Sequence, residues 1–172
     1  MGAETLKEKE AELTGMFEPY YTKIARYAYV RIGDRLSAED IASEVFLKAL
    51  KALPSYHERG LPMSAWLFRI AHNMVVDFLR QKSKGHSVSL DDIDLPSDVN
   101  PAHLAETRLE MARVNQAMKA LSPAQQEVVR LRFLAELSSK EVAAVMGKSD
   151  GAVREMESSA IARLRQMLVD SA

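Results

Sequence analysis

The side chains with the most chemistry to offer lie in the stretch of residues 62–84. Its polar side carries amide, carboxylate and basic groups at intervals of two to four residues, at Asn73, Asp77, Arg80, Lys82 and Lys84. Amide and guanidinium groups form hydrogen bonds with base edges, and ammonium groups contact phosphates. The set indicates a surface that binds an anionic polymer, although a basic helix end is more often only a solvated cap.

The same stretch is predicted to be one helix. Apolar residues recur at every fourth position, at Trp66, Ile70, Met74 and Phe78, and the next positions along add Leu67, Ala71 and Val75 to a wide apolar stripe. This is the spacing of a helical face that packs against a protein core. Trp66 is therefore expected to be a core residue.

Carboxylates gather near the start of a second predicted helix, which runs from about Ser37 to Leu53. Ser37 and Asp40 have the spacing of a capping box, in which each side chain binds a free backbone N–H of the first turn. The acids of its first two turns are Glu39, Asp40 and Glu44. On physical grounds they fit a stabilised helix start as well as a binding surface.

A polar loop that contains an aromatic residue follows Pro54. It carries Tyr56, His57 and Arg59. A stacking ring and hydrogen-bonding groups are what single-strand base recognition needs. A Tyr-His pair is also common in a packed turn, so the loop alone does not distinguish the two interpretations.

Helical spacing returns in the C-terminal part of the chain. Ser122 with Gln125, and Ser138 with Glu141, form two further predicted capping boxes. Gly147 ends the short helix that follows Ser138, and a long helix resumes after it. A short helix, a glycine-containing turn and a second helix form the helix-turn-helix pattern, whose second helix enters the major groove of DNA.

Composition limits the remaining possibilities. The 172 residues are 47% hydrophobic and carry a net charge of -1, so any contact with nucleic acid has to come from local patches of charge. There is no cysteine, which excludes disulfides and thiolate chemistry and fits a reducing cytoplasm. The four histidines show no metal-ligand spacing, so neither a metal nor a cofactor is expected.

Helical periodicity throughout, with few glycines and prolines, predicts an all-α fold of two small helical domains joined by a flexible acidic linker. The expected segments are a flexible tail at 1–12, a first domain at 13–84, the linker at 85–105 and a helix-turn-helix domain at 106–172. No apolar run approaches the roughly 20 residues that span a bilayer. A soluble cytoplasmic protein without membrane insertion is expected.

Two sets of sequence motifs resemble bacterial RNA polymerase sigma factors of the extracytoplasmic-function (ECF) group. The run A-W-L-F-R-I-A-H-N at residues 65–73 is similar to their promoter-reading helix, and S-A-E-D-I at 37–41 is similar to their polymerase-docking segment. Ser37 stands where the group usually has Asp. In the C-terminal part, L-S-P at 121–123, M-G at 146–147 and G-A-V-R at 151–154 resemble their -35-binding domain in order and spacing.

The resemblance implies a non-enzymatic subunit that binds core RNA polymerase and directs it to promoter DNA with -35 and -10 elements, assisting strand opening. Glu39, Asp40 and Glu44 would bind polymerase. The loop residues Tyr56, His57 and Arg59, with the polar face of residues 73–84, would read the -10 strand. The implied -35 contacts are Ser149, Asp150, Gly151, Arg154, Glu155 and Ser158.

The group is commonly held inactive by an anti-sigma factor that covers both domains, so the resemblance implies such a partner too. One departure from the group is the acidic start of the recognition helix. Glu155 and Glu157 lie where basic and hydroxyl residues are usual, and carboxylates near phosphates lower DNA affinity. Glu155 could instead accept a hydrogen bond from a cytosine amino group.

Two other classes of protein fit parts of the sequence. A helix-turn-helix regulator would use its N-terminal half to sense a ligand or to dimerise, and would bind DNA without polymerase. An enzyme would need a nucleophile with a base, a metal motif or a phosphate-binding glycine loop, and the sequence shows none of these motifs.

Overall fold

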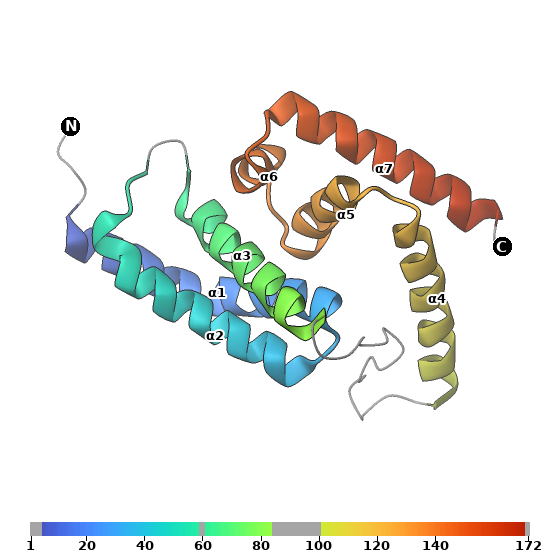
Figure 1. Ribbon diagram of the computed structural model, residues 1–172, viewed down its shortest axis with the longest axis horizontal. Coiled ribbons are helices and arrows are strands. Elements are labelled where there is room, and N and C mark those ends of the chain that lie inside the picture. Colours follow the sequence, from blue (N-terminus) through green and yellow to red (C-terminus); the bar gives the residue numbers. More distant parts are fainter. Residues whose placement is uncertain (1–4, 59–60, 84–100, 171–172) are drawn as a thin grey trace.

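The computed structural model describes residues 5–58, 61–83 and 101–170, and the regular elements of these ranges are all helices (Figure 1). The predicted all-α fold is confirmed. In chain order the helices are α1 (Leu6–Ile32), α2 (Arg35–Ala52), η1 (Leu53–Ser55), α3 (Met63–Ser83), α4 (Pro101–Lys119), α5 (Pro123–Val129), the π-helix η2 (Arg130–Leu134), α6 (Ser139–Met146) and α7 (Asp150–Asp170).

Helices α1, α2 and α3 pack together as the N-terminal domain. Small residues such as Ala42 and Ala71 are fully buried and allow the helices to approach closely. Aromatic rings fill the remaining space, because Tyr27 and Phe68 meet edge to face with their centroids 5.8 Å apart and are both fully buried. Trp66 is only partly buried and lies at the edge of this core, whereas Leu67, Ala71 and Val75 of the same predicted apolar face are fully buried.

Two helix starts differ from the sequence-based expectation. Helix α1 begins at Leu6 behind a Thr5–Glu8 capping box, and its Lys9 is buried with its ammonium group donating to the Tyr56 carbonyl oxygen at 2.5 Å. Residues 6–12, which were expected to belong to a flexible tail, are therefore helical, and the long-range contact of Lys9 with Tyr56 holds them. Helix α2 is capped by Asp34, which accepts from the Ser37 backbone N–H, so the predicted Ser37 cap is wrong by three residues.

The C-terminal domain contains α4 to α7. Both predicted capping boxes, at Ser122 and Ser138, are present. Gly147 ends α6 in the left-handed conformation with a φ of 64°, which glycine adopts without strain. Helices α6 and α7 form the predicted helix-turn-helix. Helix α4 begins at Pro101, five residues before the expected start of this domain, and residues 84–100, which include most of the expected linker, lie outside the described residues.

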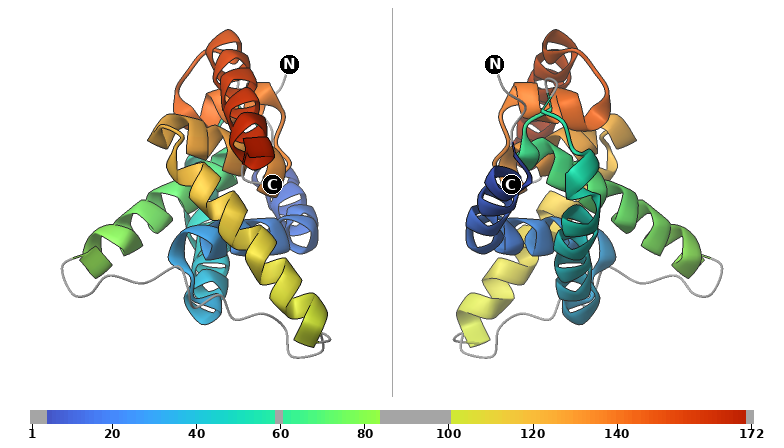
Figure 2. Two further views of the ribbon diagram at one scale, coloured as in Figure 1. Left: turned by 90° about the vertical axis from the view of Figure 1, so that its right-hand side faces the viewer. Right: turned by 90° about the vertical axis from the view of Figure 1, so that its left-hand side faces the viewer.

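The two domains lie against each other. Helix α6 packs against α3, and η2 packs against α1, although these elements are far apart in the sequence. Figure 2 shows the C-terminal helices α5, α6 and α7 stacked over the N-terminal group. Buried apolar residues of both domains form one contiguous cluster that runs from Ile24 and Phe68 to Leu131 and Val142.

Replacement of Phe68 by alanine is expected to lower the free energy of unfolding by about 3–5 kcal/mol, because the ring is fully buried and leaves a cavity. Trp66→Ala should cost less, because Trp66 is partly exposed. Urea unfolding followed by far-UV circular dichroism measures both. An equal or larger loss for Trp66→Ala would contradict this assignment of the core.

Candidate functional site

The outer face of α2 carries both acids and exposed leucines. Asp40 is exposed, while Glu39 and Glu44 are half-buried, and Glu39 accepts a hydrogen bond from Arg35 Nε at 3.1 Å. Three leucines that sequence analysis did not assign to a surface share this side of the helix: Leu36, Leu47 and Leu50, which are 71%, 50% and 52% exposed. Apolar side chains rimmed by charge are typical of a protein-binding surface.

The polar residues of α3 lie on its exposed side, as predicted. Asn73, Asp77 and Arg80 are exposed, and Arg80 Nη1 lies 3.7 Å from an Asp77 carboxylate oxygen. Lys82 is half-buried and holds its ammonium group over the Phe78 ring, 5.5 Å from the centroid. Lys84 lies outside the described residues. The described members of this set can be reached by a partner along one side of the helix.

The loop after η1 differs from the expectation at Tyr56. Its side chain is buried, its ring lies 4.5 Å from the Trp66 ring between centroids, and its hydroxyl donates to the Leu61 carbonyl oxygen at 2.9 Å. The ring is not accessible for base stacking here, because it fills the edge of the core under Trp66. His57 is exposed, and Arg59 lies outside the described residues.

The start of α7 is open to a partner. Ser149 caps the helix by accepting from the Ala152 backbone N–H at 3.1 Å, and Gly151, Glu155 and Ser158 are exposed. Arg154, whose side chain is 65% exposed, lies 3.2 Å from the half-buried Asp150 carboxylate. These are the six residues that the sequence placed on the DNA-reading surface.

The two glutamates near the start of α7, Glu155 and Glu157, have different surroundings. Glu157 accepts from Arg132 Nε at 3.0 Å, and its side chain is only 16% exposed. Arg132 in turn donates to the Leu137 carbonyl oxygen at 2.6 Å. The charge of Glu157 is thus balanced by the Arg132 guanidinium group, whereas Glu155 faces solvent.

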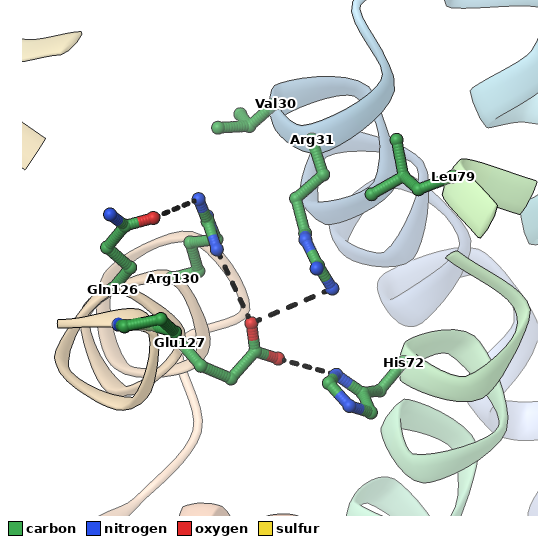
Figure 3. A pocket seen from close by; sticks show the side chains of 8 residues that line it. Val30, Arg31, His72, Leu79, Gln126, Glu127 and Arg130 are labelled. Atoms are coloured by element: carbon green, nitrogen blue, oxygen red, sulfur yellow. Dashed lines mark hydrogen bonds and ion pairs between the residues drawn. The ribbon is translucent and has the colours of Figure 1, made fainter. Parts of the chain in front are cut away.

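A buried polar cluster between the domains was missed by sequence analysis. Its centre is Glu127 of α5, whose side chain is 8% exposed. Tyr27 donates to Glu127 Oε1 at 2.5 Å and His72 Nδ1 lies 2.9 Å from the same oxygen, while Arg31 and Arg130 lie 3.9 and 3.6 Å from Oε2. Figure 3 shows the carboxylate pointing at His72, with the two guanidinium groups on its other side.

The electrostatics of this cluster keep Glu127 charged. Burial by itself would raise the pKa of Glu127, but hydrogen bonds from His72 and Tyr27 and the Arg31 charge outweigh burial and hold it below its ordinary value. A carboxylate can only accept a hydrogen bond, so the hydrogen in the contact with Glu127 Oε1 is on His72 Nδ1. Burial and the neighbouring Glu127 charge raise the pKa of Tyr27 far above its usual range, so its hydroxyl remains a donor.

Within the described ranges, no group of three or more His, Asp or Glu side chains could hold a metal ion. None of the described helices combines the length and apolar character needed to cross a membrane.

Each of the two helical domains matches a known protein family. Residues 16–85 match the family description Sigma-70 region 2, and residues 117–166 match Sigma-70, region 4. The chain is 35% identical over 166 residues to the ECF RNA polymerase sigma factor BldN of Streptomyces coelicolor, covering 95% of this chain and 63% of that protein. It is 31% identical over 173 residues to the ECF sigma factor SigD of Mycobacterium tuberculosis, covering 97% of this chain and 82% of SigD.

Solved structures share the fold. CnrH, in complex with the cytosolic domain of CnrY, superposes with a TM-score of 0.70 at 24% identity over 97% of this chain and 94% of CnrH. The sigma factor RpoE of Bartonella quintana, in complex with the anti-sigma factor NepR, gives 0.64 at 24% identity over 94% of this chain and 97% of RpoE.

The protein is thus an all-helical chain that pairs a Sigma-70 region 2 with a Sigma-70 region 4. It belongs to the RNA polymerase sigma factors of the ECF group, as the sequence motifs indicated. It spans 63% of the length of BldN.

Acidification should weaken the domain contact through Glu127. The pKa of Glu127 in the folded protein lies below its ordinary value of 4.5. The stabilisation that the Glu127 carboxylate contributes is therefore fully present above pH 4.5, and it is lost as the pH falls through the folded-state pKa. We expect Glu127→Gln to remove this part of the pH dependence. Unfolding midpoints of the wild type and of Glu127→Gln, measured between pH 3 and pH 7, test this prediction. If the midpoint depends on pH in the same way for both proteins, the prediction is contradicted.

Two glutamates of α7, Glu155 and Glu157, should respond differently to neutralisation. Glu155→Gln should strengthen binding to a -35 duplex, because a solvent-facing negative charge near the phosphates is removed. Glu157→Gln should instead lower the melting temperature, because it weakens the pair with Arg132. Fluorescence anisotropy with labelled duplex and thermal unfolding measure the two effects. A reversed pattern would show that Glu157 faces the DNA.

Proposed function

We propose that this chain is a sigma subunit that binds core RNA polymerase, directs it to promoters with -35 and -10 elements and assists strand opening. The observation that carries the proposal is the presence of both sigma regions, in order, in one chain. A helix-turn-helix regulator has no use for region 2, which makes polymerase-independent DNA binding the weaker alternative. The role is non-enzymatic and is performed where polymerase acts, in the cytoplasm.

The α2 face is the proposed polymerase contact. Asp40 is exposed between half-buried Glu39 and Glu44, and exposed leucines continue the same side of the helix. The carboxylates would favour a partner surface that carries basic residues. The leucines would add buried apolar area when the partner covers this face. This proposal assigns a role in polymerase binding to Leu36, Leu47 and Leu50, which the motif alone does not include.

The promoter contacts are divided between α3 and α7. Asn73, Asp77 and Arg80 would meet the -10 strand together with His57 and Arg59, and Lys82 and Lys84 would contact phosphates. Tyr56 would join them only after its ring leaves Trp66. The start of α7, from Ser149 to Ser158, would enter the -35 major groove.

An anti-sigma factor is a further proposed partner. CnrH and RpoE were solved as complexes with the cytosolic domain of CnrY and with the anti-sigma factor NepR. The exposed α2 face of this chain would be available to such a partner whenever polymerase is absent.

The test is capture of purified core RNA polymerase by the tagged chain. Asp40→Arg should reduce capture at least tenfold, because it reverses a charge at the centre of the α2 face. Stability should change by no more than about 0.3–1 kcal/mol, the scale of an exposed charge near a helix start. Thermal unfolding of the same variant checks that it is folded.

The matched control is Glu10→Arg, the same charge reversal at an exposed position of α1. It should capture polymerase as well as the wild type. Failure of the wild-type chain to capture purified core polymerase would favour the DNA-binding regulator instead.

A further inference from the structure

The start of α1 lies against η1 and the loop that follows it (Figure 1). Lys9 is 7% exposed, and its ammonium group donates to the Tyr56 carbonyl oxygen at 2.5 Å. One turn further along α1, Leu13 is buried in the core of the N-terminal domain. The first turns of α1 are thereby fixed against the backbone of the loop.

Lys9 belongs to a part of α1 that the family match does not include. Sigma-70 region 2 matches residues 16–85, and Lys9 comes before them. The capping box of Thr5 and Glu8 starts the helix just ahead of Lys9, so the backbone that carries the ammonium group is held in helical form. A helical segment before the matched region therefore supplies a contact to the loop.

Burial makes this contact important to the loop. An ammonium group removed from water needs an acceptor in place of its hydration, and the Tyr56 carbonyl oxygen serves as one. A hydrogen bond from a charged donor is also stronger than one between neutral groups. Lys9 therefore holds the Tyr56 carbonyl group more firmly than a neutral donor would.

Tyr56 is held at further points that connect the loop to its surroundings. Its hydroxyl donates to the Leu61 carbonyl oxygen at 2.9 Å, and its backbone N–H donates to the Leu53 carbonyl oxygen at 3.1 Å. Its ring packs on the Trp66 ring of α3, with 4.5 Å between centroids and 31° between planes. Tyr56 thus joins the two ends of the loop to each other and to α3, and Lys9 joins the same residue to α1.

The position of the Tyr56 carbonyl group decides where the exposed part of the loop begins. The peptide bond is planar, so the Tyr56 carbonyl group and the His57 backbone N–H lie in one rigid unit. His57 is exposed, and it is one of the residues proposed above to meet the -10 strand. A donor that fixes this peptide plane therefore also fixes the backbone from which the His57 side chain extends.

We propose that Lys9 is a positioning residue for recognition of the -10 element: its ammonium group fixes the peptide plane between Tyr56 and His57, and with it the exposed side chains of the loop. The proposal rests on the promoter function proposed above. A loop that is already ordered loses less conformational entropy when it binds single-stranded DNA. Removal of the ammonium group should therefore weaken recognition of the -10 element and leave the polymerase and -35 contacts unchanged.

The link from Lys9 to Tyr56 is tested by fluorescence. The chain contains one tryptophan, Trp66, whose ring lies on the Tyr56 ring, so its emission reports on the loop. Lys9→Met keeps an unbranched apolar side chain and removes the ammonium group. It is expected to shift the Trp66 emission to longer wavelengths and to increase its quenching by acrylamide, because a loosened Tyr56 uncovers the indole ring.

The matched control is Lys7→Met, the same loss of charge at an exposed position of the same helix. Its Trp66 emission should equal that of the wild type. Helical circular dichroism of both variants should also equal that of the wild type, which separates a loosened loop from an unfolded domain. Unchanged Trp66 emission in Lys9→Met overturns the proposal that Lys9 positions the loop.

The role in promoter opening is tested with the full chain bound to purified core polymerase. The probe is a promoter fragment selected from a random-sequence DNA library by the wild-type complex, and permanganate reactivity of its unpaired thymines measures opening. Lys9→Met should lower the rate of opening by at least about fivefold, the scale of one hydrogen bond. Polymerase capture and binding of the isolated -35 duplex should stay equal to those of the wild type.

The outcomes distinguish this proposal from the function on which it rests. Wild-type opening by Lys9→Met, or an equal loss in Lys7→Met, overturns the role of Lys9 in -10 recognition. An equal loss of polymerase capture or of -35 binding in Lys9→Met also overturns it, because the effect would then not be confined to the loop. Failure of the wild-type chain to capture polymerase would overturn the proposed sigma function instead, and the Trp66 emission would still decide whether Lys9 positions the loop.

Discussion

The buried carboxylate of Glu127 is the interaction on which the arrangement of the two domains depends. A charge removed from water is costly unless it is surrounded by donors and opposite charge, and here the donors come from α1 and α3 while the acid comes from α5. The apolar surfaces of these helices could pack in several ways. The carboxylate reaches all four partners only when the domains meet as they do in this structure.

Pairing within the chain also decides which charges are available to partners. The net charge is close to zero, yet Asp40 of α2 and Asn73, Asp77 and Arg80 of α3 remain exposed. Glu157 is held by Arg132, whereas Glu155 on the same helix is left facing solvent. Local pairing of this kind leaves a nearly neutral protein with separate exposed charged residues on α2, α3 and α7.

Residues whose role follows from local spacing were predicted well. The capping boxes at Ser122 and Ser138, the Gly147 stop and the exposed stripe of Asn73, Asp77 and Arg80 depend on neighbours within one turn or two. The predicted Ser37 cap was a local error, because Asp34 caps α2 instead. The other errors occurred where a distant contact decides the outcome. Lys9 is helical and buried because it reaches the Tyr56 carbonyl oxygen, and Tyr56 is buried because Trp66 covers it.

Local patterns were enough to predict the helices, the caps at Ser122 and Ser138, the helix-turn-helix and the sigma family, because each depends on periodicity or on motifs of adjacent residues. That Glu127 lies beside Tyr27, 100 residues away in the chain, and beside His72, 55 residues away, could be learned only from the folded structure. Sequence periodicity relates only residues within a few turns, so it does not predict a contact between positions so far apart. Their meeting follows from the packing of two domains, which brings together groups that a linear pattern leaves unrelated.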